Sequence, residues 1–271
     1  MPDRHVESRE QVTMPVVFVG HGSPMNAIEE NRWSRGFSNL AQNFGRPRAI
    51  LAISAHWYVD GTFLTGNQHP QTIHDFGGFP EALYQVRYPA PGSPEVAERV
   101  RELLAAQGAT LRLDWGLDHG TWSVLRWMYP DADIPVVQLS IDRRLEEREH
   151  IANGSCLKDL RKEGILIVAS GNIVHNLRDA FSQQRTGRFT TPDWARQFDE
   201  AVVNALETYR TDSLLALSAT AQGRMAHPTP DHWLPLLYAY GAAEEGEPLN
   251  SPIVGFDWGS LSMRSIVFGS R

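Results

Sequence analysis

The chain has 271 residues, and its composition, 42% hydrophobic and 21% charged, is that of a globular protein, which excludes a disordered chain. Its 25 Lys and Arg residues against 32 Asp and Glu residues give a formal net charge of −7, which excludes a protein that binds nucleic acid through a basic surface. A mean hydropathy of −0.33, with no apolar run near the roughly 18 residues of a membrane span, excludes a transmembrane protein.

The start of the chain and its cysteine content indicate where the protein folds. Residues 1–13 are charged and contain no apolar stretch, so they are predicted to form a loose leader and not a secretory signal. The single cysteine, Cys156, cannot form an intramolecular disulfide, so the fold does not depend on oxidation. We therefore expect a cytoplasmic protein whose folded domain runs over residues 14–271. Its oligomeric state is not predicted.

Short apolar runs rich in β-branched residues predict buried strands along the whole chain. These runs cover residues 15–19, 49–55, 134–141, 165–169, 253–256 and 262–268. Amphipathic segments between them predict helices. Ser93 followed by Pro94 is typical of a helix start, and Gly108 is placed to end that helix. Thr191 and Pro192 repeat the same start signal.

The alternation of strands and helices determines the predicted fold class. Strands that are apolar along their full length require cover on both faces, as in a mostly parallel sheet with helices on either side. No repeat or Pro/Ser-rich linker divides the chain. The sequence therefore predicts a single α/β domain with a central, mostly parallel sheet flanked by helices.

Histidines follow three of the predicted strands. His21 comes directly after the first run, His56 directly after the second, and His175 shortly after the fourth. Ligands of open α/β sheets bind outside the carboxyl ends of the strands, so these side chains can converge without regular spacing in sequence. Neutral imidazole is a common ligand for zinc and also suits Fe²⁺. From the pattern alone, a shared metal site and separate hydrogen-bonded histidines are equally favoured.

Two further histidines lie in predicted loops of similar character. His119 stands in DHGTW and His232 in PTPDHW, each close to a tryptophan. In contrast, His5, His69 and His150 stand in polar surroundings and are predicted to lie on the surface.

Motifs of other catalytic sites are missing from the sequence. It contains no G-x-G-x-x-G, no G-x-x-x-x-G-K-[ST], no H-E-x-x-H and no G-x-S-x-G. Ser23 lies near His21, but its surroundings are not those of a nucleophile elbow, and we expect it to cap a turn into the next helix.

One long segment, residues 72–92, is aromatic, rich in Gly and Pro, and has little periodicity. Loops of this length inside a compact domain are usually functional. Two roles are open: its aromatic side chains line a pocket for a flat ring, or Phe76, Phe79 and Tyr84 pack the segment on the core as a lid.

Seven motifs in chain order, from about Met14 to the C-terminus, resemble those of the class III extradiol ring-cleavage dioxygenases, and more narrowly the 4,5-DOPA dioxygenase group. They are GHGSPMN (20–26), SAHW (54–57), TIHDFGGFPEALY (72–84), YPAPGSP (88–94), DHGTW (118–122), SGNIVHNL (170–177) and PTPDHWLPLLY (228–238). The resemblance implies that residues 14–271 form a catalytic domain. It implies a metal-dependent oxidoreductase that opens the ring of a catechol such as DOPA beside its two hydroxyls, with O₂ as the second substrate.

The resemblance also assigns roles residue by residue. His21 and His56 match the metal ligands of the family, and His232 falls where the wider class uses a glutamate ligand. His175 matches the proposed base and lies near the metal, so it is a candidate both for a fourth ligand and for a catalytic residue. His119 matches a catalytic histidine near the substrate and oxygen. An all-nitrogen set suits Zn²⁺ at least as well as Fe²⁺, so one divalent metal of either kind is expected per chain.

Two other functions would use the same histidines. Zinc acting as a Lewis acid on water would make a hydrolase, and a non-catalytic relative would bind a metal or a partner in the same cleft. Iron sites of oxygenases typically include one carboxylate, which Asp231 or Glu81 would supply, but the motifs favour neither. The presence of His119 and His175, which a minimal metal site does not need, favours an enzyme. The dioxygenase is therefore the prediction, with a catechol and O₂ as partners and neither nucleic acid nor membrane.

The sequence does not determine the substituent on the catechol ring. Arg87, in the 72–92 segment, is the nearest candidate to bind a substrate carboxylate, because arginine matches carboxylate geometry. A surface ion pair is the other role open to Arg87.

Overall fold

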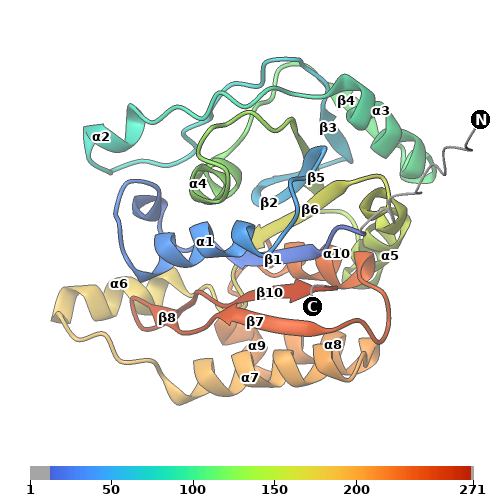
Figure 1. Cartoon of the computed structure of the whole chain (residues 1–271). Helices are drawn as coiled ribbons and strands as arrows, with labels where there is room; N and C mark the ends of the chain where they lie inside the picture. The colour runs from blue at the N-terminus through green and yellow to red at the C-terminus, as the bar shows by residue number, and fades with distance from the viewer. Residues whose placement is uncertain (1–12, 270–271) are drawn as a thin grey trace, which may run out of the picture.

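The structure is a computed structural model that describes residues 13–269, so the predicted leader and His5 lie outside the described residues, apart from Thr13. An eight-stranded sheet runs through these residues in the order β4-β3-β5-β2-β6-β1-β10-β7 (Figure 1). The strands are β1 (Val16–Gly20), β2 (Ala49–Val59), β3 (Phe63–Thr65), β4 (Thr110–Arg112), β5 (Val136–Asp142), β6 (Ile165–Gly171), β7 (Leu249–Ile253) and β10 (Ser265–Phe268). A separate hairpin pairs β8 (Phe256–Asp257) with β9 (Leu261–Ser262).

The helices lie between the strands along the chain. They are α1 (Arg32–Gln42), α2 (Glu81–Tyr84), α3 (Pro94–Leu103), α4 (His119–Met128), α5 (Glu147–Cys156), α6 (Leu177–Thr186), α7 (Asp193–Glu207), α8 (Thr211–Ser218), α9 (Ala221–Ala226) and α10 (Leu234–Ala242), with 3₁₀ turns η1 (Pro24–Ala27), η2 (Ala105–Gln107) and η3 (Lys158–Arg161). Within residues 13–269, no helix has both the length and the apolar character needed to cross a bilayer.

The four central strands β5, β2, β6 and β1 pair in parallel, which confirms the predicted mostly parallel sheet. Antiparallel pairing is confined to the flanks, where β10 pairs with β1 and β7, and β3 pairs with β5. Because the central strands point the same way, their carboxyl ends meet at one edge of the sheet.

Both faces of the sheet are buried, as the unbroken apolar runs predict. In β1, Val16 and Phe18 pack into one core together with apolar side chains of α3, α7 and α10, whereas Val17 and Val19 pack into the other with those of α1 and α4. Figure 1 shows α1 and α4 on one side of the sheet and α5 and α10 on the other. The predicted single α/β domain is thus confirmed.

The second strand is longer than predicted. Residues 49–55 were expected to form the strand and His56 to follow it, but β2 continues to Val59 and includes His56. The register of β2 against β5 shifts between Ile53 and Tyr58, so the pairing of the two strands is irregular around His56. Strands β3 and β4 were not predicted, since three residues are too few to show a periodic pattern.

Helix starts follow the predicted capping signals in most places. Ser93 Oγ accepts a hydrogen bond from the backbone of Val96 at 3.3 Å, with Pro94 as the first helical residue. Ser23 Oγ likewise accepts from the backbone of Met25 at 3.2 Å and caps η1, which confirms its role in a turn. The predicted start of α7 is shifted, because the helix begins one residue after Pro192.

The prediction that His150 lies on the surface is wrong. His150 is fully buried on α5, and its Nδ1 lies 3.3 Å from the hydroxyl of Tyr238 on α10. Its polar neighbours in sequence occupy the solvent face of the helix, while α10 covers the face that carries His150. His69, as predicted, is exposed.

Candidate metal and active site

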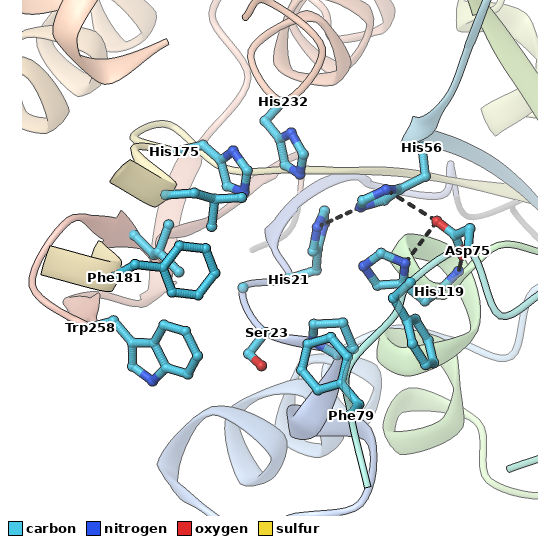
Figure 2. Close-up of a pocket in the computed structure, with 15 residues that line it drawn as sticks. His21, Ser23, His56, Asp75, Phe79, His119, His175, Phe181, His232 and Trp258 are labelled. Atoms are coloured by element: carbon cyan, nitrogen blue, oxygen red, sulfur yellow. Dashed lines mark hydrogen bonds and ion pairs between the residues drawn. The ribbon is translucent and has the colours of Figure 1, made fainter. Parts of the chain in front are cut away.

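Three histidine side chains converge at the carboxyl edge of the sheet (Figure 2). His21, His56 and His232 each offer a ring nitrogen, and these nitrogens all lie within 4.8 Å of one another. Nε2 of His21 is 3.2 Å from Nε2 of His56. Two nitrogens bound to one tetrahedral ion at about 2.0–2.1 Å would lie about 3.3 Å apart. The spacing therefore fits a shared cation, as predicted for these three residues.

The orientation of His21 follows from its partner on the neighbouring strand. His21 comes directly after β1, and its Nδ1 lies 2.9 Å from Oγ of Ser170 on β6. That hydroxyl donates its only proton to the backbone oxygen of Gly120 at 2.6 Å. Ser170 must therefore accept from Nδ1–H of His21, which leaves Nε2 of His21 with a free lone pair.

His232 is brought to the site by a close backbone contact. Its backbone oxygen accepts a hydrogen bond from the backbone of Asn172 at 3.0 Å, just beyond β6. A Cβ atom on Gly171 would lie 2.3 Å from the same oxygen, so only glycine allows this approach. Nδ1 of His232 is hydrogen-bonded to Asp231, while Nε2 is buried and has no partner among the described residues. A buried nitrogen that has no hydrogen-bond partner and lies near two other imidazoles is the arrangement expected of a metal ligand.

Asp75 holds both His56 and His119. Its Oδ2 lies 3.2 Å from Nδ1 of His56 and 2.8 Å from Nδ1 of His119, and its Oδ1 accepts from the backbone N–H of His119 at 2.9 Å. With Nδ1 of each ring turned to the carboxylate, Nε2 of each is the free nitrogen. The prediction that His119 lies in a loop is wrong, because His119 is the first residue of α4 and Asp118 is the N-cap of that helix.

Sequence reasoning did not identify Asp75, although it stands inside the TIHDFGG motif. Asp231 and Glu81 were the carboxylates considered. Asp231 instead supports His232, and Glu81 is exposed on α2 and does not line the pocket that the histidines share. The signal in the sequence that could have identified Asp75 is its position as an acidic residue next to His74 in a segment rich in Gly and aromatic residues.

The electrostatics of the cluster favour neutral imidazoles. Burial, reinforced by the neighbouring imidazoles, lowers the pKa of His21 and of His232 well below the ordinary value, and it lowers the pKa of His56 to about 3. Burial alone would raise the pKa of Asp75, but the hydrogen bonds from His119 and the electrostatic interactions with His119 and His56 outweigh it and lower that pKa to about 2. Neutral imidazoles beside an ionised carboxylate are the protonation states that metal binding requires.

His175 lies beside the three converging histidines but is not part of their group. Its ring is stacked on that of His232, with centroids 3.5 Å apart and planes inclined by only 6°. Its backbone N–H donates to Ala226 at 2.9 Å, and burial lowers its pKa to about 4. The lone pair of an imidazole lies in the ring plane, and two parallel planes do not meet at one ion. This packing therefore favours one of the two rings as ligand, not both.

A cavity of about 260 Å³ opens next to the histidines. Phe76 and Phe79 of the 72–92 segment line one side of it. Tyr84 does not line the cavity but packs against Phe76, with ring centroids 5.3 Å apart. The two roles expected for the segment are therefore divided between residues: two phenylalanines form a pocket wall, and Tyr84 supports that wall from behind.

Comparisons with known proteins agree with this geometry. Residues 15–259 match the family described as the catalytic LigB subunit of aromatic ring-opening dioxygenase. The chain is 48% identical to a 4,5-DOPA dioxygenase extradiol of Escherichia coli (strain K12), over 94% of this chain and 95% of that protein. It is 39% identical to a 4,5-DOPA dioxygenase extradiol of Beta vulgaris, over 93% and 96%. The crystal structure of an uncharacterized Escherichia coli K12 protein, 43% identical, superposes with a TM-score of 0.82 and covers 94% of this chain and 100% of that one.

Proposed function

The chain belongs to the family of the catalytic LigB subunit of aromatic ring-opening dioxygenases, and on that premise we propose that it opens a catechol, the class to which DOPA belongs, beside its two hydroxyls with Fe²⁺ and O₂. It is an extradiol aromatic ring-opening dioxygenase and hence an oxidoreductase. The observation that carries the proposal is the convergence of three anchored imidazoles at one end of an aromatic pocket.

We assign His21, His56 and His232 as the residues that hold the metal. Each turns Nε2 to the common point, while Ser170, Asp75 or Asp231 fixes its Nδ1. Such outer partners set the tautomer and the direction of a ligand. Fe²⁺ is proposed over Zn²⁺, because zinc has no redox chemistry and the reaction consumes O₂. When bound, the iron supplies the one-electron chemistry that allows O₂ to react with the catechol.

Two further histidines are placed to move protons. His175 is neutral at pH 7 and lines the pocket beside His232, so it is the proposed base for a catechol hydroxyl. His119 also lines the pocket, and its Nε2 is free to exchange a proton with substrate because Nδ1 is hydrogen-bonded to Asp75. The earlier expectation that His175 is also a ligand stays a prediction, and its stacking on His232 favours the role of a base.

Removing any of the three proposed ligands is expected to abolish stoichiometric metal binding. Changing an outer partner of a ligand already costs about 10–100-fold in metal affinity, so His21→Ala, His56→Ala and His232→Ala should each cost at least about 100-fold. Metal content after dialysis, measured by plasma mass spectrometry, checks this. His69→Ala, which removes an exposed histidine, is the matched control. A ligand variant that keeps one tightly bound metal per chain would contradict the assignment.

The function itself is tested by anaerobic reconstitution with Fe²⁺, followed by a catechol and then O₂. A yellow ring-opened product is expected from the iron protein and none from the zinc protein. If no catechol gives a product, while the zinc protein cleaves esters or amides, the hydrolase alternative replaces the dioxygenase. If neither form turns over any substrate, a non-catalytic metal-binding role replaces it.

A further inference from the structure

Two apolar walls face each other across the mouth of the pocket. Phe76 and Phe79 form one wall, and Leu177 and Phe181 of α6 form the other together with Trp258 of the β8–β9 hairpin. Figure 2 shows Phe181 and Trp258 on the side of the pocket opposite Asp75 and His119. Leu177 and Phe181 are 41% and 46% exposed, which leaves their side chains available to a ligand.

The wall on the α6 side is built in a strained conformation. Trp258 has φ +44°, in the left-handed region that a bulky side chain rarely adopts. The next residue, Gly259, has φ +77°, and a Cβ atom there would lie 2.3 Å from the side chain of Gln183 on α6. The hairpin is thus pressed against α6, and the rings of Trp258 and Phe181 lie 5.8 Å apart. Strain of this kind persists where the surrounding packing enforces it, and it gathers at ligand sites.

The described residues that line this pocket include no basic side chain of the Lys or Arg type. The only carboxylate among them, Asp75, is already bonded to two histidines. Arg87, expected as a partner for a substrate carboxylate, is not in the lining. Its guanidinium instead donates to the backbone oxygens of Tyr84 at 2.7 Å and Val86 at 2.9 Å.

We propose that the pocket selects catechols with an uncharged, apolar substituent, which lies between the walls formed by Phe79 and by Phe181 and Trp258. The inference rests on the proposed ring-opening function and specifies its substrate class. An apolar chain gains free energy when these rings remove it from water. A carboxylate or ammonium group packed against the same rings would lose part of its hydration without gaining an ion-pair partner. The zwitterionic side chain of DOPA is therefore a poorer match than an alkyl chain.

A series of catechols with side chains of similar length and different charge tests the inference on the iron-reconstituted protein. The four compounds are 4-propylcatechol, 3-(3,4-dihydroxyphenyl)propionate, dopamine and DOPA, which carry no charge, a negative charge, a positive charge and both charges. We expect kcat/KM for 4-propylcatechol to exceed that for each charged compound by about 10-fold or more. Each buried methylene is worth about fourfold, so 4-propylcatechol should also exceed 4-methylcatechol by about 10-fold.

A matched pair of variants links this preference to the proposed wall. Phe181→Ala should lower the ratio of kcat/KM for 4-propylcatechol to that for 4-methylcatechol. Phe189→Ala removes a phenylalanine that is 54% exposed and outside the pocket lining, so it should keep the wild-type ratio. Equal kcat/KM for all four charge types, or a preference for dopamine or DOPA, would overturn the inference and leave the ring-opening function intact. Failure of every catechol would instead remove the ring-opening function and this inference with it.

Discussion

His175→Ala is expected to lower turnover by roughly 10²–10⁴-fold, the usual contribution of a positioned acid or base. His175 is neutral, lines the pocket and is held by its backbone hydrogen bond to Ala226, so it can accept a proton from a catechol hydroxyl. Metal affinity should fall only modestly, because the variant removes the ring stacked on His232 and not one of the three converging nitrogens. Single-turnover rates and metal titration of the same preparation measure both effects.

Excess metal distinguishes the roles open to His175. If it is the base, saturating Fe²⁺ leaves the variant slow. Full recovery of turnover at high metal concentration would show that His175 is a ligand and would refute the proposed role. His69→Ala serves as the control for loss of a histidine at the surface, and an unchanged Tm excludes general unfolding as the cause.

Asp75→Asn is expected to lower kcat/KM by about 10²–10⁴-fold and to weaken metal binding as well. Asp75 accepts two hydrogen bonds from His119, from its Nδ1 and from its backbone N–H, and its Oδ2 also lies 3.2 Å from Nδ1 of His56. An asparagine has one acceptor oxygen and an NH₂ group that only donates. With its NH₂ group at the Oδ2 position the asparagine faces both ring N–H groups, and with NH₂ at the Oδ1 position it faces the backbone N–H of His119. Either orientation leaves at least one N–H without its acceptor, and both rings lose the neighbouring negative charge. The change therefore affects a proposed ligand and a proposed proton carrier together.

Asp231→Asn is the matched comparison for Asp75→Asn. Asp231 supports one ring only, through Nδ1 of His232, and its side chain is 21% exposed. The asparagine oxygen can keep that hydrogen bond while its NH₂ group turns to solvent, so a loss of about 10-fold or less is expected. Equal losses in the two variants, measured as kcat/KM and as metal content, would contradict the double role of Asp75.

Local patterns in the sequence were sufficient to predict the frame of the site. Apolar runs that need burial on both faces predict a parallel sheet, and parallel strands end at the same edge. That alone brings His21, His56 and His175 to one place, and the resemblance of the motifs adds His119 and His232. Each of these residues lies at that edge in the structure, as lining of one pocket. Their chemical roles remain proposals.

The contacts between side chains that are distant in sequence were decided by the tertiary structure, because the hydrophobic periodicity of the sequence does not encode them. Asp75 lies 44 residues from His119 in sequence, so their hydrogen bond depends on how a long aperiodic segment folds back over the edge of the sheet. The stacking of His175 on His232 likewise joins two segments through packing alone. Burial of His150 depends on α10 covering α5, although its neighbours in sequence are polar. Local sequence determines which residues reach the sheet edge, because strand direction follows from hydrophobic pattern. The pairing of side chains there is set by long-range contacts, because short-range patterns carry no information about distant partners.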